Sequence, residues 1–468
     1  MNLAFSYIIP AVQWFFFLYF VVVNLGYMML NAVALSAIYK YMQRRAMEGM
    51  EKQFSRLRPP VSILIPAYNE AATISSSVRS MLQINYSEYE VVVINDGSRD
   101  DTLAALKRDF GLVMVPEAVR RRLESKPVRG AYVSRLHPKL RVIDKENGGK
   151  SDSLNAGINA SRFPLFCCVD ADSILEHDSL TKVVQPFLED PHTIAAGGSV
   201  RAVNGCTVSG GHLLKSALPK NPVALFQIIE YFRGYLIGRL GWSELNSLMI
   251  ISGAFGLFKK EAVIEAGGYD TGTVGEDMEL VVRLHRLMRE KRKKYSISFI
   301  PDPVCWTEVP EDLVTLRGQR IRWQRGLAES MYLNRSLLFS RHGGMVGWFT
   351  MPFLIAFELF GSVIEVAGFF FTIIGFLLGV VSLKAFLAFI FLAIGLGIML
   401  SVNSLLIEEL SFKVYKKPSN ALTLFLFAVA ENFGYRQYNS WWRVVGLWRF
   451  AAGKRGGWGE MKRRGLER

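Results

Sequence analysis

The chain has 468 residues, of which 50% are hydrophobic and 21% charged, and its 55 Lys and Arg against 41 Asp and Glu give a net charge of +14. Such a high apolar content beside so many charges predicts that the two kinds of residue lie in different segments, which disfavours disorder and a simple soluble enzyme. The 4 cysteines show neither metal-ligand spacing nor a disulfide framework. The 6 histidines form no HxxxH pattern, so a structural zinc site has little support.

The first segment is apolar from Ile8 to Tyr39 and carries no charged side chain. A helix of about 20 such residues crosses a bilayer, so we expect one transmembrane helix here. A cleavable signal peptide fits poorly, because no basic region precedes the apolar run and no clear small-residue cleavage site follows it. Lys40, Arg44 and Arg45 follow directly, which by the positive-inside rule places the next segment in the cytoplasm.

The middle of the chain has the composition of a soluble domain. Its short apolar runs rich in β-branched residues predict buried strands, and the stretch after the first of them predicts a helix. The predicted strands are Val61–Pro66, Tyr89–Ile94, Leu140–Ile143 and Leu165–Val169, and the helix is Ala71–Leu82. Strands that alternate with helices indicate a parallel sheet, whose ligands bind beyond the carboxyl ends of the strands.

Acidic side chains fall at those strand ends. Asp96 follows the second predicted strand, and Asp170 and Asp172 follow the fourth. Two carboxylates one residue apart can direct oxygen atoms to a hard divalent cation and leave its other positions for pyrophosphate and water, although a solvated turn is the alternative. A glycine turn that ends at Lys150 could approach phosphates, but it lacks the GxxxxGK[ST] spacing of a P-loop kinase.

The last third of the chain carries a second set of apolar segments. Two are long enough to cross a membrane, and two are short enough to be interfacial or re-entrant helices. The long ones are Val363–Val381 and Ala385–Ile407, and the short ones are Met345–Leu359 and Ala421–Phe433. With two crossings the basic tail and the lysines between the last two segments face the cytoplasm, as the charge rule expects, whereas four crossings would place those lysines outside.

Three acidic residues lie within or beside these apolar segments, namely Glu358, Glu365 and Glu431. A carboxylate inside a membrane is costly, so we expect them to face a bundle interior or a polar conduit. The alternative is that they mark interfacial helix ends.

Together these features resemble the family 2 inverting glycosyltransferases, and specifically their membrane-embedded processive branch of cellulose, hyaluronan, chitin and poly-N-acetylglucosamine synthases. The motifs occur in the family's order across nearly the whole chain. They are Asp170-Ala171-Asp172 for DxD, Ser252-Gly253-Ala254 for the acceptor-side turn, Gly275-Glu276-Asp277 for Thr-Glu-Asp, and Gln319-Arg320-Ile321-Arg322-Trp323 for QxxRW. The resemblance implies a Rossmann-like α/β nucleotide-diphospho-sugar transferase domain of GT-A type, inserted between N- and C-terminal transmembrane helices.

The resemblance also implies a role for each matching residue. The implied donor-binding residues are Ala67, Tyr68, Glu70, Asp96, Lys150 and Asp170, and Asp172 is the implied ligand of Mg²⁺ or Mn²⁺. The implied catalytic residues are Asp277 and Arg322, and the implied acceptor-binding residues are Ser252, Gly253, Glu276, Gln319 and Trp323. Two positions depart from the family pattern: Asn95 stands where an aspartate is usual, and Gly275 stands where a threonine is usual.

Physical arguments support three of these roles. Asp277 stands at the start of the helix-like stretch Glu276–Arg289, which has an apolar face. A carboxylate there could take the proton of an attacking sugar hydroxyl, a step typically worth ~10²–10⁴-fold. The alternative is an acidic helix start that only favours the dipole. Arg322 could stabilise the charge on a departing UDP, and Trp323 could stack on a sugar ring, the alternative being an interface anchor.

The expected domains are a transmembrane helix in 1–45, a cytosolic glycosyltransferase domain in 53–338, transmembrane or interfacial helices in 345–435, and a basic cytosolic tail in 436–468. Within the tail, residues 457–465 are similar to the gating loop of chitin and hyaluronan synthases, the alternative being a basic membrane-surface tail. We therefore expect a multi-pass protein of the cell membrane with a cytoplasmic catalytic domain.

The expected activity is inverting, processive transfer of a hexose or N-acetylhexosamine from a UDP-sugar to a growing β-linked polysaccharide, which leaves through the membrane bundle. The alternatives are non-processive glycosylation of a lipid or lipid-linked acceptor, and a catalytically silent partner of another synthase. Membrane lipids and accessory secretion subunits are further expected partners. Nucleic acid is not, because no basic and aromatic pattern matches a recognised module.

Overall fold

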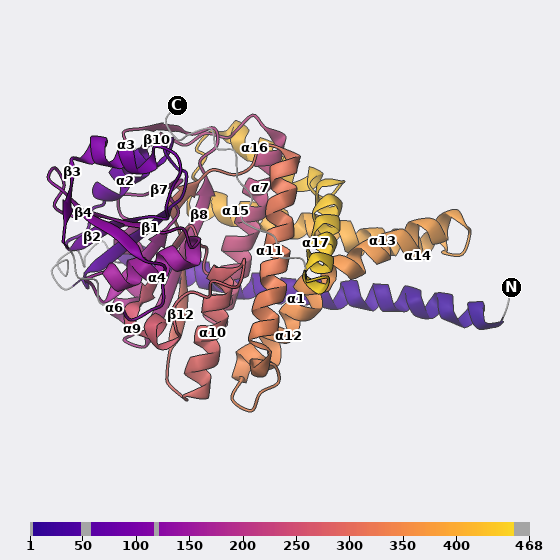
Figure 1. The fold of residues 1–468 in the computed structure, drawn as a ribbon. Coiled ribbons are helices and arrows are strands. Elements are labelled where there is room, and N and C mark those ends of the chain that lie inside the picture. The colour runs from indigo at the N-terminus through magenta and orange to yellow at the C-terminus, as the bar shows by residue number, and fades with distance from the viewer. Residues whose placement is uncertain (1–2, 48–57, 117–120, 454–468) are drawn as a thin grey trace.

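The computed structural model describes residues 3–47, 58–116 and 121–453. Its α/β domain is built on a ten-stranded sheet, and apolar helices from both ends of the chain project together from one side of that domain (Figure 1). The N-terminal helix α1 therefore lies beside helices that are more than three hundred residues later in the sequence.

The centre of the sheet is parallel and consists of the four strands predicted from the sequence. β1 (Val61–Ala67) lies between β2 (Tyr89–Asn95) and β6 (Leu165–Val169), and β2 also pairs with β5 (Leu140–Lys145). Every residue of β2 and β6 is buried, which explains their continuous apolar sequence. The carboxyl ends of β1, β2 and β6 meet at one edge of the sheet.

The sheet is mixed rather than wholly parallel, because strands that the sequence did not predict extend it on both sides. The sheet order is β3-β4-β5-β2-β1-β6-β11-β8-β12-β7, in which β11 runs antiparallel to both β6 and β8. The added strands are β3 (Leu112–Val115), β4 (Val128–Ser134), β7 (Ser173–Leu175), β8 (Thr193–Ala202), β11 (Phe255–Lys259) and β12 (Ser296–Thr307). A separate hairpin pairs β9 (Thr207–Ser209) with β10 (His212–Lys215).

Helices connect these strands. The predicted first helix is α2, which begins at Ile74, three residues later than expected, and the predicted helix at Glu276 is α10. The helices of this domain are α2 (Ile74–Leu82), α3 (Thr102–Phe110), α4 (Lys150–Ala160), α5 (Ser179–Val183), α6 (Gln185–Glu189), α7 (Pro222–Phe232), α8 (Leu240–Glu244), α9 (Lys260–Glu265), α10 (Glu276–Glu290) and α11 (Leu313–Leu333), and a π-helical stretch (Arg233–Arg239) joins α7 to α8.

Among the described residues, two helices are long and apolar enough to cross a membrane. The first is Tyr7–Arg44 within α1 (Leu3–Met47), as predicted. The second is Leu383–Ser411, which joins α14 (Leu383–Ile390) to α15 (Leu396–Ser411) through a π-helical stretch.

The predicted separate span at Val363–Val381 differs in the structure. Its helix α13 (Gly361–Leu377) has 17 residues and ends in a turn, and it follows Val346–Leu359 at a bend of 42°. The two segments together form a broken span or a re-entrant loop, because each alone is short. The apolar helix α16 (Pro418–Ala430) has 13 residues, which suits an interfacial position better than a crossing.

The first part of the expected basic tail is helical. α17 (Tyr435–Ala451) packs along α11 and α13, and Figure 1 shows it beside α11. The candidate gating loop at 457–465 lies outside the described residues.

Candidate active site

One cavity of about 1400 Å³ begins at the strand edge and continues between the apolar helices. Every site residue expected from the sequence lines it, from Ala67 and Tyr68 after β1 to Gln319, Arg322 and Trp323 on α11. The cavity also reaches Tyr27 of α1 and Glu358, more than three hundred residues apart in sequence. The motifs thus converge on one space because they stand at strand ends and helix starts that face it.

Asp96 organises the glycine turn at the donor side of this cavity. Its carboxylate accepts hydrogen bonds from the backbone N–H groups of Gly148 at 3.0 Å and Gly149 at 2.7 Å, and it pairs with Lys145 Nζ at 2.6 Å. Lys145 is fully buried and also lies 2.6 Å from Asp152 Oδ1. Asp96 therefore holds the turn that presents Lys150, and Lys145 is a supporting residue that the motifs did not reveal. No sequence signal marks Lys145, because β5 also carries Arg141 and Asp144.

Lys150 lies at the centre of the site. Its Nζ is 2.5 Å from Asp170 Oδ1 and 3.5 Å from Glu276 Oε1, and it donates to the carbonyl of Gly253 at 3.4 Å. Burial alone would lower the pKa of Lys150, but the carboxylates of Asp170 and Glu276 more than compensate and hold it above its ordinary value. The ammonium group stays charged and joins three motifs that are distant in sequence.

Asp277 occupies the first turn of α10, where its carboxylate is fixed by backbone groups. Oδ2 accepts from the N–H of Gly253 at 3.1 Å, and Oδ1 accepts from the N–H of Met278 at 2.8 Å. The preceding Glu276 is buried, and burial raises its pKa above the usual range although Lys150 opposes the shift. A pair of neighbouring carboxylates with different environments is typical of a site in which one of them accepts a proton.

The QxxRW motif lies on α11, which Asp312 caps by accepting from the N–H of Thr315 at 2.8 Å. The guanidinium of Arg320 lies 4.4 Å from the centre of the Trp323 ring and forms an ion pair with Glu230 of α7. Trp323 remains 47% exposed, so one face of its ring is available in the cavity.

Glu230 is a supporting residue that the sequence motifs did not identify, and its partner Arg320 occupies a variable position of QxxRW. Tyr435 donates a hydrogen bond to Glu230 at 3.0 Å, and Asn439 donates another at 2.9 Å. Glu230 thus connects α7, α11 and α17. No sequence signal marks this cluster, because its members are up to 209 residues apart.

The acidic residues that could hold a metal ion are Asp170 and Asp172, which line the same cavity. Within the described residues no three His, Cys, Asp or Glu side chains come close enough to hold a metal alone. Two carboxylates fit a hard cation whose remaining ligands are phosphate oxygens and water, and they do not fit a closed structural metal site.

The acidic residues of the apolar segments face the bundle interior, as one of the two interpretations expected. Arg443 Nη2 lies 2.8 Å from Glu358 Oε2, and Ser440 donates to Glu365 at 2.7 Å. Glu431 is fully buried and pairs with Arg233. Glu358 and Glu365 line the cavity, so its end between the apolar helices carries polar groups.

The sequence model of the glycosyltransferase-like family 2 matches residues 59–326, which include the sheet and the site described above. The chain belongs to the family 2 glycosyltransferases. A chitin synthase family model also matches residues 273–443, from the turn before Asp277 through most of the C-terminal helices. The α/β transferase fold between apolar helices, expected from the resemblance, is therefore confirmed.

Curated relatives of this glycosyltransferase include poly-beta-1,6-N-acetyl-D-glucosamine synthases. The one from Staphylococcus aureus (strain COL) is 30% identical over 269 residues, which cover 57% of this chain and 54% of the relative. The one from Staphylococcus epidermidis is 29% identical over 269 residues. The chain thus spans about half the length of the curated relatives it matches.

Among solved structures, a mannosyltransferase from Pyrobaculum calidifontis, determined with GDP-Man and Mn²⁺, covers 92% of this chain at 18% identity and a TM-score of 0.49.

Proposed function

We propose that this glycosyltransferase transfers a hexose or N-acetylhexosamine from a UDP-sugar to a growing β-linked polysaccharide, with inversion at the anomeric carbon, and that the product leaves between its membrane helices. The observation that carries the proposal is the single cavity that joins the strand edge at Asp170 to the apolar helices at Glu358. A soluble acceptor would not require that connection. The similarity to poly-beta-1,6-N-acetyl-D-glucosamine synthases supports a polysaccharide product.

In the proposed reaction Asp277 is the general base. The acceptor hydroxyl oxygen attacks the anomeric carbon from the face opposite the UDP, and its proton moves to a carboxylate oxygen of Asp277. The bond between the anomeric carbon and the phosphate oxygen breaks with its electron pair, so UDP leaves. Because Gly253 and Met278 donate to Asp277 from the backbone, the carboxylate is oriented before the substrate binds.

Charge on the leaving group would be stabilised by Lys150 and Arg322, which both line the cavity. We propose that Asp172, with Asp170, holds Mg²⁺ or Mn²⁺ together with the donor pyrophosphate. Such a cation, when bound, would supply further positive charge beside the donor pyrophosphate. The exposed face of Trp323 would hold the terminal sugar of the acceptor.

We further propose that the protein is a multi-pass protein of the cell membrane with its catalytic domain in the cytoplasm. The two apolar helices and the basic residues after Tyr39 support this topology. Membrane lipids would surround the helices, and accessory secretion subunits could join them.

A donor panel tests the function. The purified protein in lipid nanodiscs is supplied with one UDP-sugar at a time and Mg²⁺ or Mn²⁺, and both UDP release and product length are measured. We expect one donor to give long β-linked chains, and EDTA to abolish the reaction. A single sugar on a lipid would instead favour the non-processive alternative, and full activity in EDTA would remove the metal from the proposal.

A further inference from the structure

The helix with the base and the helix with the acceptor motif touch at two glycines. A Cβ atom added to Gly275, directly before α10, would lie 2.7 Å from the Cα of Gly326 on α11. A Cβ added to Gly326 would likewise lie 2.8 Å from the Cα of Gly275. Side chains cannot occupy such spaces, so only glycine at both positions allows α11 to approach the start of α10 this closely.

A carboxylate on α11 holds the same turn. Oε2 of Glu329 accepts hydrogen bonds from the hydroxyl of Thr273 at 2.9 Å and from the N–H of Val274 at 2.9 Å. Thr273 Oγ1 in turn accepts from the N–H of Gly275 at 3.2 Å. The other oxygen of Glu329 accepts from Arg325 Nε at 2.7 Å, and the Glu329 side chain is only 12% exposed. Glu329 therefore fixes the residues that lead into Asp277.

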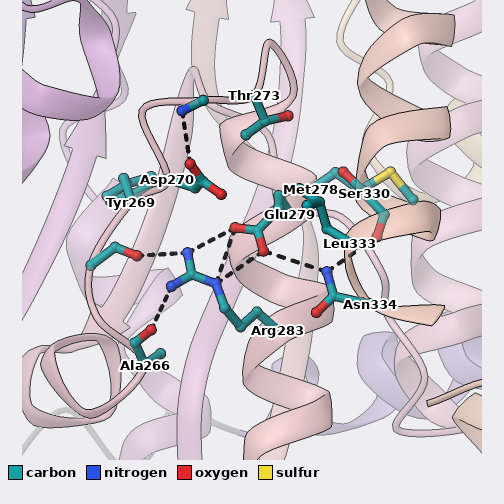
Figure 2. Close-up of polar contacts among 12 residues, drawn as sticks. Ala266, Tyr269, Asp270, Thr273, Met278, Glu279, Arg283, Ser330, Leu333 and Asn334 are labelled. Carbon is teal, nitrogen blue, oxygen red and sulfur yellow. Dashed lines mark hydrogen bonds and ion pairs between the residues drawn. The ribbon is translucent and has the colours of Figure 1, made fainter. Parts of the chain in front are cut away.

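The segment before this turn is attached to α10, as Figure 2 shows. Arg283 donates to the carbonyl of Gly268 at 2.7 Å and to that of Ala266, and it pairs with Glu279 at 2.7 Å. Glu279 also accepts, at 3.4 Å, from Asn334 at the end of α11. The segment 266–275 is thus held at one end by α10 and at the other by α11, which leaves the two helices little freedom to shift relative to each other.

We infer that Glu329 is a positioning residue, which sets the separation between the base Asp277 and the acceptor platform at Trp323. This inference rests on the proposed function, in which those two residues act on the same acceptor. Glu329 stands six residues after Trp323 on α11, and Thr273 stands four residues before Asp277. Glu329 itself touches neither substrate in this assignment.

The inference predicts how the UDP-sugar is divided between transfer to a sugar acceptor and hydrolysis by water. A sugar acceptor must be held by Trp323 and deprotonated by Asp277 at once, so a shift between α10 and α11 slows transfer. A water molecule needs no platform, so hydrolysis of the UDP-sugar tolerates the same shift. A misplacement of about 1 Å can reduce a rate on the order of 10²-fold.

The test compares transfer and donor hydrolysis in nanodiscs for three variants. Glu329→Ala removes the carboxylate, and we expect polymer formation to fall by about 100-fold while UDP-sugar hydrolysis and UDP affinity stay near the wild-type values. Glu329→Gln keeps an oxygen that can accept from Thr273 and Val274, so we expect it to restore most of the transfer rate. The matched control Glu265→Ala removes an acid that pairs with Lys291 and Lys293 on the surface, and it should change neither rate.

Equal losses of transfer and hydrolysis in Glu329→Ala, or no loss of either, would overturn the inference. If that variant does not fold, Thr273→Val removes the hydroxyl from the same contact and should give the same change in partition. The two proposals fail separately: a wild-type protein that makes no polymer from any UDP-sugar refutes the proposed function, whereas a wild type and Glu329→Ala that make polymer equally refute only the positioning role.

Discussion

Lys150 shows what a single residue contributes beyond its motif. The glycine turn before it suggested a phosphate contact, and the structure places its ammonium group between Asp170, Glu276 and the carbonyl of Gly253. Its positive charge opposes the effect of burial on Glu276, whose pKa is nevertheless raised. The negative charge of a nucleotide would then enter a site whose own charges are already partly balanced.

The substitution Asp277→Asn separates proton transfer from donor binding. The amide keeps the shape of the carboxylate but cannot accept a proton, so we expect polymer formation to fall by ~10²–10⁴-fold. UDP binding, measured by calorimetry on the same variant, should change little, because the amide has the same size and shape as the carboxylate it replaces. A loss of UDP affinity as large as the loss of rate would make Asp277 a donor-binding residue.

His285 predicts a pH dependence of stability away from the cavity. Burial lowers its pKa to about 4, and its ring nitrogens contact the hydroxyl of Tyr295 at 2.7 Å and the carbonyl of Leu248 at 2.9 Å. The unfolded chain takes up a proton near pH 6.5 and the folded chain does not, so this contribution is present above pH 6.5 and is lost as the pH falls toward 4.

The loss is on the order of 3 kcal/mol over that interval. Thermal unfolding in detergent between pH 7 and 4.5 measures it, with His285→Gln as the comparison. The variant should be less stable at pH 7, and its deficit should shrink as the pH falls. A deficit that is the same at every pH would contradict this assignment.

At the scale of elements, the contact between α10 and α11 depends on glycine. Gly326 meets the backbone of Gly275, whereas a Cβ added to Gly318 on the same helix would have no atom of the described residues within 4 Å. The same substitution can therefore be compared at two positions of α11: Gly326, where a Cβ atom has no space, and Gly318, where it has space.

We expect Gly326→Ala to push α11 away from α10, to lower the transition temperature and to reduce polymer formation at least tenfold, a change of about 1.4 kcal/mol in barrier. Gly318→Ala should leave activity unchanged and stabilise the helix by roughly 0.5–1 kcal/mol. Thermal unfolding and polymer assays on both variants provide the measurement. Similar behaviour of the two variants would show that the close approach is unimportant.

The strands that could be predicted from the sequence are those in which apolar residues occupy buried positions. Apart from Ser62, the residues of Val61–Ala67 and Leu165–Val169 are apolar, because both faces of these strands are buried, so sequence alone identified them. β8 was missed because its alanines and glycines have low strand propensity. Its glycines fit the packing instead, since a Cβ at Gly198 would lie 2.3 Å from the side chain of Val304.

Some residues of the candidate site could also be predicted from the sequence, and others could not. Asp170, Asp277 and Trp323 belong to local motifs and were expected, and they line one cavity. Glu230 and Glu329 were not expected, because their partners are 90 and 56 residues away in the sequence. A single sequence carries no signal for contacts between distant residues, so the supporting groups required the structure.

At the scale of the whole molecule, a buried ion pair connects the sheet to a helix that is long and apolar enough to cross a membrane. Arg201 of β8 and Glu408 of α15 are each 1% exposed, and their charged groups lie 2.5 Å apart. Arg201 also lies over the ring of Phe232, with 4.8 Å between the guanidinium carbon and the ring centre. This ion pair holds the sheet against the apolar helices that surround the far end of the cavity.

Removal of one partner should leave a buried charge, so we expect Glu408→Ala to destabilise the protein by about 3–5 kcal/mol. The neighbouring Glu409→Ala, which deletes the same side chain from a less buried position, should change stability by less than about 0.5 kcal/mol. Thermal unfolding in detergent compares the two. Replacement of both partners, Arg201→Met with Glu408→Leu, should recover much of the stability lost in Glu408→Ala. An equal loss of stability in Glu408→Ala and Glu409→Ala would contradict the role of the pair.

The N-terminal helix α1 has a practical consequence for any attempt to dissect this protein. Tyr19, Asn24 and Tyr27 of α1 form part of the cavity wall, and Leu30 fits so closely against α8 that a Cβ at Gly241 would lie 2.6 Å from it. A soluble fragment that begins after α1 would therefore lack one side of its own active cavity and would expose an apolar surface in its place. The sequence suggests that α1 is only a membrane anchor, whereas the structure shows that it also forms part of the cavity wall.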